Sequence, residues 1–361
     1  MNAIDILFET APYGWDQKTK EDYYLRELKE RTEFHRARSA SYTHITDALG
    51  WDQAHVGSIA DIPFFPVRLF KDFELRSVEE SEVFKTMTSS GTTGQRVSRI
   101  FLDRANSLRQ TKVLAKICSD FLGSKRLPML ILDSRAAVKD RTLFSARGAG
   151  ILGFSMLGRQ PFYALDDDMQ LDVDGILSYL ERQQDQGETD LFLFGFTSII
   201  WEHFYKKLKE IGTRLPLERG ILIHGGGWKK LQAESVSNDC FKESLADVCG
   251  IRRVYNYYGM VEQTGSIFME CEVGHLHASI FSDPIIRRPA DFSPAASEER
   301  GLVQLVSLLP TSYPGHSILT EDEGAIVGID DCPCGRLGKR FKIYGRIQNA
   351  EIRGCSDTFQ R

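Results

Sequence analysis

The chain lacks an excess of positive charge. Its 361 residues include 45 Lys and Arg against 50 Asp and Glu, which gives a formal net charge of −5. Proteins that bind nucleic acids neutralise phosphates with clustered Lys and Arg, so this balance argues against a nucleic-acid partner. A content of 42% hydrophobic and 26% charged residues is typical of a globular, enzyme-sized protein with a large buried core, and it excludes collagen-like and disordered chains.

Long apolar runs are also missing. The longest stretch, residues 191–201, is interrupted by Gly195, Thr197 and Ser198 and is much shorter than the ~20 residues of a membrane helix. The N-terminal segment carries acidic residues where a secretory signal has a basic start and an apolar run. We therefore expect no membrane span and a cytoplasmic location. The 7 cysteines, an odd number, are expected to be reduced thiols, metal ligands or a nucleophile, and not a disulfide framework.

The hydrophobic pattern predicts an α/β fold. Residues 1–60 are polar with spaced apolar positions, which indicates an N-terminal helical region. Short apolar runs then alternate with amphipathic ones, as in a parallel sheet covered by helices on both faces. The predicted strands are residues 129–132, 191–194, 220–223 and 254–258, and the predicted helices are residues 199–208, ending at Gly212, and 234–248.

Beyond Ser266 the pattern changes to short alternating runs at residues 267–269, 302–306 and 325–329. Alternation of this kind predicts a smaller β-rich lobe. Residues 283–301 contain three prolines and several charges and are expected to form a surface excursion.

A run of small hydroxyl residues and glycines precedes Arg96. Backbone amides and hydroxyls in such a loop can converge on phosphate oxygens, and the arginine adds charge. The loop is not a Walker A motif, because no Gly-Lys-Ser/Thr follows. An ordinary polar hairpin turn is the alternative. The candidate phosphate ligands are Ser89, Ser90, Gly91, Thr92, Thr93 and Gly94.

A second motif, Asn-Tyr-Tyr-Gly-Met-Val-Glu at residues 256–262, lies where a predicted strand ends. Ligands bind at the carboxyl ends of parallel strands, where Tyr258 can stack on a base and Glu262 can bind Mg²⁺. Alternatively, Glu262 is a solvated loop carboxylate.

Three cysteines and one histidine have spacings that suit a metal. Cys271 and His277 in one segment, with Cys332 and Cys334 in another, match a tetrahedral zinc set. His275 is a rival ligand. The alternative is a pair of buried thiols with an unrelated surface histidine.

Taken in order, these motifs resemble those of adenylate-forming acyl ligases. The resemblance rests on Ser-Ser-Gly-Thr-Thr-Gly at 89–94, Gly-Gly-Gly at 225–227, Tyr-Gly-x-x-Glu at 258–262, Thr-Glu-Asp at 320–322 and Gly-Arg at 345–346. Cys-Pro-Cys-Gly-Arg at 332–336 is similar to the phenylacetate-CoA ligase branch. The short chain, Gly-Gly-Gly-Trp at 225–228 and the ending around Cys355 are more similar to the acyl-protein synthetases of the bacterial luminescence fatty-acid reductase complex.

The resemblance implies the fold and a role for each motif. The fold is the large α/β domain of an adenylate-forming ligase over residues 61–344, with the β-rich lobe after 266 and without the mobile C-terminal domain. Residues 345–361 form a hinge and a short tail. The 89–94 loop would hold the β- and γ-phosphates of ATP, and Glu262 would hold Mg²⁺. The remaining nucleotide contacts are assigned to Gly225, Gly226, Gly227, Tyr258, Gly259, Asp322 and Arg346.

The implied function is ATP-dependent activation of a carboxylic acid, of the fatty-acid class, as an acyl adenylate. The acyl group then passes to a protein thiol, that of Cys355. The alternatives are transfer to coenzyme A or a carrier protein, with Cys355 a bystander thiol, or an inactive nucleotide- or acyl-binding subunit. An acyl reductase, a transferase or a carrier protein is the expected partner. ATP, Mg²⁺ and a structural Zn²⁺ are the expected cofactors.

Overall fold

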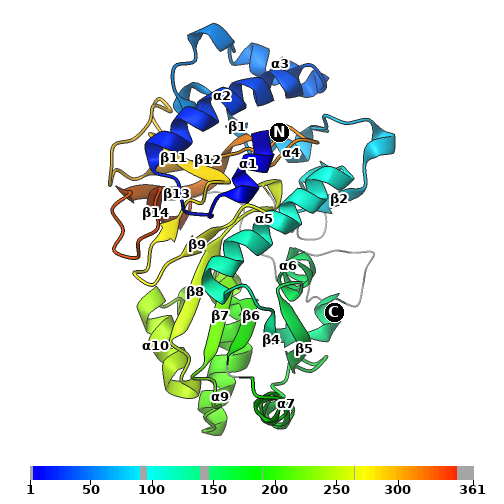
Figure 1. Ribbon diagram of the computed structural model, residues 1–361, viewed down its shortest axis with the longest axis vertical. Helices are drawn as coiled ribbons and strands as arrows, with labels where there is room; N and C mark the ends of the chain where they lie inside the picture. The colour runs from blue at the N-terminus through cyan, green and yellow to red at the C-terminus, as the bar shows by residue number, and fades with distance from the viewer. Residues whose placement is uncertain (1–2, 90–95, 139–145, 189, 264, 348–361) are drawn as a thin grey trace. The chain divides into compact units, whose positions relative to one another are not determined.

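The computed structural model describes residues 3–89, 96–138, 146–188, 190–263 and 265–347 (Figure 1). The chain divides into two compact units. The first unit comprises residues 1–89, 94–117 and 259–351, and the second unit comprises residues 90–93, 118–258 and 352–361. The domain boundaries drawn from the sequence stay predictions.

The second unit is built on a parallel sheet. Its strands lie in the order β8-β7-β6-β4-β5, and each neighbouring pair is parallel. The bounds are β4 (Leu127–Ser134), β5 (Gly158–Leu165), β6 (Leu191–Phe196), β7 (Gly220–Gly225) and β8 (Arg253–Tyr258). Four of these strands contain the predicted apolar runs. Fully buried strands such as β6 and β7 read as continuous apolar sequence, because helices cover both faces of the sheet.

Helices cover both faces of this sheet. The helices are α6 (Ala146–Ser155), α7 (Val173–Asp185), a continuous helix made of α8 (Thr197–Ile199), η5 (Ile200–Tyr205) and α9 (Lys206–Ile211), and α10 (Asn238–Cys249). Side chains of α7, η5, α9 and α10 share one core with the sheet. From α6, Phe154 stacks on Phe194 of β6 with ring centroids 4.2 Å apart.

The predicted helix ends are set by local chemistry. Gly212 ends α9 with φ +66°, a left-handed conformation that suits glycine, as expected. The helix predicted from residue 234 instead begins at Asn238, because the Ser237 side chain caps it by accepting from the N–H of Cys240.

The first unit contains the β-rich lobe expected after residue 266. Its sheet has the order β11-β12-β13-β14-β10-β9 with antiparallel neighbours, and β1 pairs with β13 in parallel. The bounds are β1 (Phe65–Pro66), β9 (Phe268–Glu270), β10 (Leu276–His277), β11 (Ser282–Arg287), β12 (Gly301–Ser307), β13 (Ser317–Ile329) and β14 (Lys339–Arg346). A separate antiparallel hairpin pairs β2 (Lys85–Thr88) with β3 (Arg99–Leu102).

One sequence prediction in this region is wrong. Residues 283–287 are not part of a surface excursion, because they belong to β11, whose six residues are all buried. The proline that suggested a loop, Pro284, is tolerated because β11 is the last strand on its side of the sheet, where a missing N–H breaks no ladder.

Helices of the first unit precede the β-rich lobe in the sequence. They are α1 (Ala3–Glu9), α2 (Gln17–Arg36), α3 (Ala40–Ala48), α4 (Leu69–Asp72) and α5 (Arg104–Leu122), of which the last five residues belong to the second unit. Lys20 of α2 forms a buried ion pair of 2.7 Å with Asp283 of β11, which fixes the helix to the sheet. None of the helices in the described part of the chain, α2 with its 20 residues included, is apolar enough to cross a membrane.

Candidate functional site

The candidate phosphate loop is carried by the β2–β3 hairpin. The hydrogen bonds of the hairpin continue to Ser89 and Ser98: the Ser89 N–H donates to the Ser98 carbonyl (3.2 Å), and the Ser98 N–H donates to Ser89 Oγ (2.9 Å). Ser90, Gly91, Thr92, Thr93 and Gly94 lie outside the described residues. The hairpin supplies the two ends of the loop, and that geometry fits both a phosphate cradle and a polar turn.

Glu262 is a buried carboxylate, 6% exposed, in the short turn η7 (Val261–Gln263). The hydroxyl of Tyr313 donates to its backbone carbonyl (2.9 Å), which anchors the turn. Burial raises the pKa of Glu262, while the Ser98 hydroxyl and the charge of Arg346 act in the opposite direction. No Lys or Arg in the described part of the chain forms an ion pair with Glu262. The alternative of a solvated loop carboxylate is therefore wrong.

Asp322 and Arg346 face each other across β13 and β14. The two are register partners, and Arg346 Nε lies 4.0 Å from Asp322 Oδ1. The N–H of Asp322 also donates to Thr320 Oγ1 (3.1 Å), so the Thr-Glu-Asp motif stabilises its own backbone. Because Arg346 also acts on the pKa of Glu262, the first unit brings three predicted site residues together.

A second group of predicted residues lies at the carboxyl ends of β7 and β8 in the second unit. Gly225 is the register partner of Tyr257, and a Cβ at Gly225 would lie 2.4 Å from the Tyr257 ring. Gly226 has φ +78°, and both Gly226 and Gly227 are exposed. Gly225 thus makes room for the Tyr257 ring, whereas Gly226 and Gly227 expose the backbone after β7; the half-buried Tyr258 ends β8. Gly259, the next residue, begins the last segment of the first unit.

Sequence reasoning missed one of the two polar groups that support these positions, Ser98. Ser98 carries no motif of its own and is recognisable only because the hairpin places it opposite Ser89. His224 lies next to the glycines, with its Nδ1 2.9 Å from Thr197 Oγ1, and burial lowers its pKa to about 3. A neutral, buried His224 positions the strand end and is not available as a general base at neutral pH.

The four predicted metal ligands converge. The ligand atoms of Cys271, His277, Cys332 and Cys334 all lie within 4.8 Å of one another, and these residues are the one such His/Cys/acid group found in the described part of the chain. Cys271 Sγ is 3.9 Å from Cys332 Sγ, and Cys334 Sγ is 3.5 Å from His277 Nε2. Two sulfurs bound to zinc at ~2.3 Å in a tetrahedron lie about 3.8 Å apart, so the separations fit. The rival His275 is not in the group.

Two turns hold this set. Cys271 begins the turn between β9 and β10, and Cys332 and Cys334 lie in the turn between β13 and β14. Glu272 of the first turn and Arg336 of the second form an ion pair of 2.7 Å. Burial, helped by the charge of Arg336, lowers the pKa of His277 to about 4, so its imidazole is neutral, the form that binds metals.

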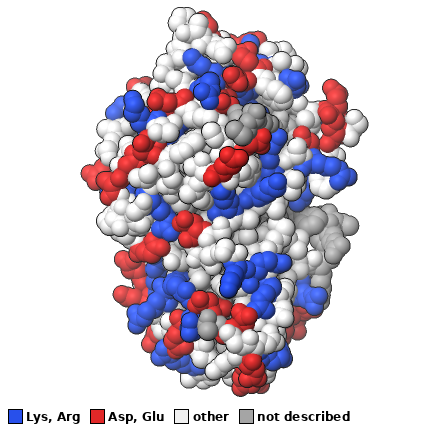
Figure 2. Space-filling view, in the orientation of Figure 1, with Lys and Arg blue, Asp and Glu red and all other residues white. Residues whose placement is uncertain are grey.

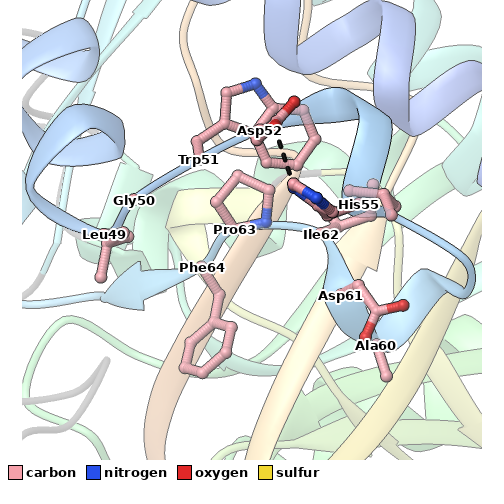
Figure 3. A pocket seen from close by; sticks show the side chains of 11 residues that line it. Leu49, Gly50, Trp51, Asp52, His55, Ala60, Asp61, Ile62, Pro63 and Phe64 are labelled. Carbon is pink, nitrogen blue, oxygen red and sulfur yellow. Dashed lines mark ion pairs between the residues drawn. The ribbon is translucent and has the colours of Figure 1, made fainter.

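A surface pocket of about 260 Å³ lies apart from these residues in the sequence, between residues 49 and 64 (Figure 3). Trp51 and Phe64 contribute rings, and Asp52 and His55, which also line the pocket, form an ion pair of 2.8 Å. None of the predicted site residues lines this pocket. Figure 2 shows Lys and Arg interspersed with Asp and Glu on the visible face, in keeping with the net charge of −5.

The family model described as "Acyl-protein synthetase, LuxE" matches residues 1–361. A long-chain-fatty-acid–luciferin-component ligase from Aliivibrio fischeri is 23% identical over 366 residues, covering 98% of this chain and 92% of that protein. The ligase of the same name from Vibrio harveyi is 22% identical over 362 residues, covering 98% and 91%.

Solved structures share the fold. A 2-hydroxyisobutyryl-CoA ligase in its postadenylation state with 2-HIB-AMP superposes with a TM-score of 0.68 at 16% identity, covering 90% of this chain and 67% of that one. Its open conformation with 2-HIB-AMP and CoA gives a TM-score of 0.67 at 17% identity, covering 91% and 75%. The fold is that of an adenylate-forming ligase, as the sequence predicts.

Proposed function

The chain belongs to the acyl-protein synthetase family, and on this premise we propose that it activates a long-chain fatty acid with ATP and passes the acyl group to a protein thiol. The relatives from Aliivibrio fischeri and Vibrio harveyi, named as long-chain-fatty-acid ligases, support this class of acid.

The observation that carries the proposal is the surroundings of Glu262. This carboxylate is buried beside Ser98, at the base of the candidate phosphate loop, and within the electrostatic influence of Arg346. Burying a carboxylate without an ion-pair partner is costly. A divalent cation bound to ATP phosphates compensates that cost, and carboxylate oxygens are the ligands that Mg²⁺ prefers.

In the first half-reaction, a carboxylate oxygen of the fatty acid attacks the α-phosphorus of ATP. The bond from this phosphorus to the bridging oxygen breaks, and pyrophosphate leaves with the electron pair. Mg²⁺, when bound, offsets the negative charge of the phosphates. Arg346 and the amides of the 89–94 loop stabilise the charge that develops on the oxygens, so catalysis rests on positioning and electrostatics and not on an acid–base pair.

The base and ribose of ATP have their own candidate contacts. We assign the adenine to the backbone of Gly225, Gly226 and Gly227, of which the last two are exposed, and Tyr258 offers its ring for stacking. Asp322 is suited to accept hydrogen bonds from the ribose hydroxyls. Its proximity to Arg346 supports a joint role for the pair.

In the second half-reaction, a thiolate sulfur attacks the acyl carbon, and AMP leaves while the thiol proton passes to solvent. We assign the thiol to Cys355, in the hinge and tail of residues 345–361. Cys355 lies outside the described residues, so this assignment rests on the family resemblance. An acyl reductase, a transferase or a carrier protein would then receive the acyl group.

Zinc is proposed as a structural ion held by Cys271, His277, Cys332 and Cys334. The sulfur and nitrogen separations suit a closed tetrahedral set, and the ion would hold the two turns together. Metal analysis of protein purified without chelator should give about one zinc per chain. Replacing Cys334 by Ser should lower this ratio, and the matched Cys240→Ser, at an exposed cysteine outside the set, should not. A full zinc ratio in Cys334→Ser would argue against the site.

Pyrophosphate exchange into ATP tests the adenylation step. Exchange should require an added fatty acid and Mg²⁺, and Glu262→Gln should reduce it at least a hundredfold, because a direct metal ligand is lost. The matched control is Glu243→Gln, at an exposed carboxylate on α10. Exchange in Glu262→Gln within a few-fold of wild type would contradict the metal assignment. No exchange with any acid would favour the inactive binding subunit.

Incubation with ATP and radiolabelled acid tests the acceptor. Label should become attached to the protein, be released by neutral hydroxylamine as expected for a thioester, and be absent from Cys355→Ser but present in Cys240→Ser. Thioester label that persists in Cys355→Ser would remove this assignment. Transfer of label to coenzyme A or to a carrier protein in the absence of labelled chain would identify the alternative acceptor.

A further inference from the structure

The glycine run at residues 225–227 is held from the core side by the side chain of Thr197. Thr197 is the first residue of α8, directly after β6, and is 7% exposed. Its Oγ1 lies 3.2 Å from the Gly225 carbonyl oxygen and 2.9 Å from Nδ1 of His224. Because Phe196 and Gly225 are register partners in β6 and β7, the pairing of two buried strands brings these groups together. One hydroxyl therefore contacts both of the last two residues of β7.

The hydroxyl of Thr197 has a single hydrogen to donate, so its two contacts depend on the tautomer of His224. If Nδ1 carries the imidazole proton, it donates to Thr197 Oγ1, and the hydroxyl donates to the Gly225 carbonyl. If Nε2 carries the proton, the hydroxyl turns to Nδ1, and the Gly225 carbonyl loses this donor. The second tautomer also leaves a buried Nε2–H without an acceptor, because Nε2 has no partner in the described part of the chain. The hydrogen bonds therefore select the tautomer with the proton on Nδ1.

Burial keeps the imidazole of His224 neutral. The residue is 2% exposed, and its ring centroid lies 4.7 Å from that of Phe241 on α10. Burial, helped by the charge of Lys242, lowers the pKa of His224 to about 3. At neutral pH the ring thus has one hydrogen, and its position decides where the Thr197 hydroxyl points.

The glycine run needs such a restraint because glycine backbone is unusually free. Gly226 has φ +78° and is exposed. Trp228 fixes the far end of the run, since its ring packs edge-on against that of Trp201, with centroids 5.2 Å apart. At the near end, the peptide group between Gly225 and Gly226 is planar and trans. Fixing the Gly225 carbonyl therefore also fixes the Gly226 N–H, which points in the opposite direction.

We propose that Thr197 is a positioning residue for nucleotide binding, and that His224 directs its hydroxyl to the Gly225 carbonyl. The inference rests on the proposed function, in which the adenine lies against the glycine run. Thr197 and His224 act from the core side, through the backbone of the run. A run that is ordered before ATP arrives loses less conformational entropy when ATP binds. The Thr197 hydroxyl should therefore lower the KM for ATP and leave the chemical step unchanged.

Pyrophosphate exchange by the full chain separates this role from a structural one. Thr197→Val keeps the shape and removes the hydroxyl, so the KM for ATP should rise about fivefold, the effect of one hydrogen bond, while kcat stays within about twofold. Thr197→Ser keeps the hydroxyl and should retain the KM of wild type.

The matched control is Thr32→Val, at a second buried threonine that contacts a carbonyl and a histidine. Thr32 of α2 donates to the Leu28 carbonyl (2.9 Å), and its Oγ1 lies 3.0 Å from Nε2 of His316. Thr32→Val should lower the urea midpoint by a similar amount to Thr197→Val without a change in KM. An unchanged KM in Thr197→Val, an equal rise in Thr32→Val, or a Thr197→Ser variant as impaired as Thr197→Val would overturn the proposal.

The tautomer is tested without ATP. Long-range nitrogen–proton NMR correlations of the His224 ring, assigned by their absence in His224→Asn, should show the proton on Nδ1 at neutral pH. A proton on Nε2 would refute the direction of the Thr197 hydroxyl. Failure of the proposed function gives a different result: wild type would then show no exchange with any fatty acid, which removes the role of Thr197 in nucleotide binding, while the proton would still be found on Nδ1.

Discussion

Replacing Asp283 by Asn should be among the most destabilising single changes in the first unit. The Asp283 side chain is fully buried and accepts from Lys20 Nζ (2.7 Å), Lys339 Nζ (2.5 Å) and Gln17 Nε2 (3.1 Å). Burial opposes ionisation, but the two ammonium groups outweigh it and lower the pKa of Asp283. The carboxylate therefore links α2, β11 and β14 through charge.

The size of the expected stability loss follows from the charged groups that remain after Asp283→Asn. Asparagine keeps the shape but removes the negative charge, so the ammonium group of Lys20, 1% exposed, faces that of Lys339 without the carboxylate that bridged them. Breaking a buried ion pair from one side costs about 3–5 kcal/mol. The stability of a typical protein is about 5–15 kcal/mol, so the free energy of unfolding should fall by about a fifth or more. Lys20→Met in the Asp283→Asn background should recover part of the loss, since Lys339 also lies 3.5 Å from Glu21.

Urea unfolding followed by circular dichroism measures this effect, with Asp331→Asn as the control at an exposed ion pair. The sign of the pH dependence is fixed by the lowered pKa. Between the folded and the unfolded pKa of Asp283 the unfolded chain binds more protons, so the stabilisation is complete above about pH 5 and is lost as the pH falls through the folded value. The difference between wild type and Asp283→Asn should shrink accordingly in acid. A loss below 1 kcal/mol at pH 7, or no recovery in the double variant, would refute this reasoning.

Three further changes test other parts of the structure. Ser98→Ala removes a hydroxyl that favours ionised Glu262, so the acidic limb of the pyrophosphate-exchange profile should move to higher pH, and an unchanged limb would contradict the contact. Gly225→Ala would place a Cβ 2.4 Å from the Tyr257 ring, so the KM for ATP should rise about tenfold and stability should fall by about 1–3 kcal/mol, as measured by exchange kinetics and urea midpoints. His224 and His316 are buried, and burial lowers the pKa of each to about 3. Below about pH 6 the unfolded chain therefore binds more protons than the folded chain, and the free energy of unfolding should fall by about 1.4 kcal/mol per pH unit for each histidine as the pH is lowered. The slope of this fall should be smaller in His316→Gln.

Periodicity predicted the parallel sheet because its strands are buried on both faces. Runs such as residues 191–194 and 220–223 contain no solvent-facing positions. The helix end at Gly212 was also predicted, because a glycine that ends a helix adopts the left-handed conformation in many proteins. The strand β5 was not predicted, because its middle residues are exposed or partly exposed and it has neither a continuous apolar run nor an alternating pattern. The prediction at Pro284 was wrong because the sequence does not show that β11 lies at the edge of the sheet, where a proline breaks no ladder of hydrogen bonds.

Contacts between distant segments could not be predicted from the sequence unless a family motif marked the residues. Arg109 of α5 donates to Thr311 Oγ1 (3.1 Å), 202 positions away, and neither residue belongs to a motif. Asp283 likewise gave no signal among the charges of residues 283–301, because its burial depends on Lys20 more than 260 positions away. Motifs reveal residues that bind a ligand. They do not reveal residues whose role depends only on contacts formed in the folded chain.

The β13–β14 hairpin explains why the metal and nucleotide motifs interleave near the C-terminal end. The strands are closed by the turn that carries Cys332 and Cys334, and at the open end Asp322 pairs with Arg346. Strand lengths alone do not fix this pairing, since the register shifts twice, at Glu323/Gly324 and at Ile326/Gly328. Each shift bends the strand locally. A side chain at Gly324 or Gly328 would collide with its neighbours, because backbone or Arg340 atoms lie within 2.6 Å of the position of a Cβ. The position of Arg346 therefore depends on two glycines that belong to neither motif, as well as on the turn at the other end.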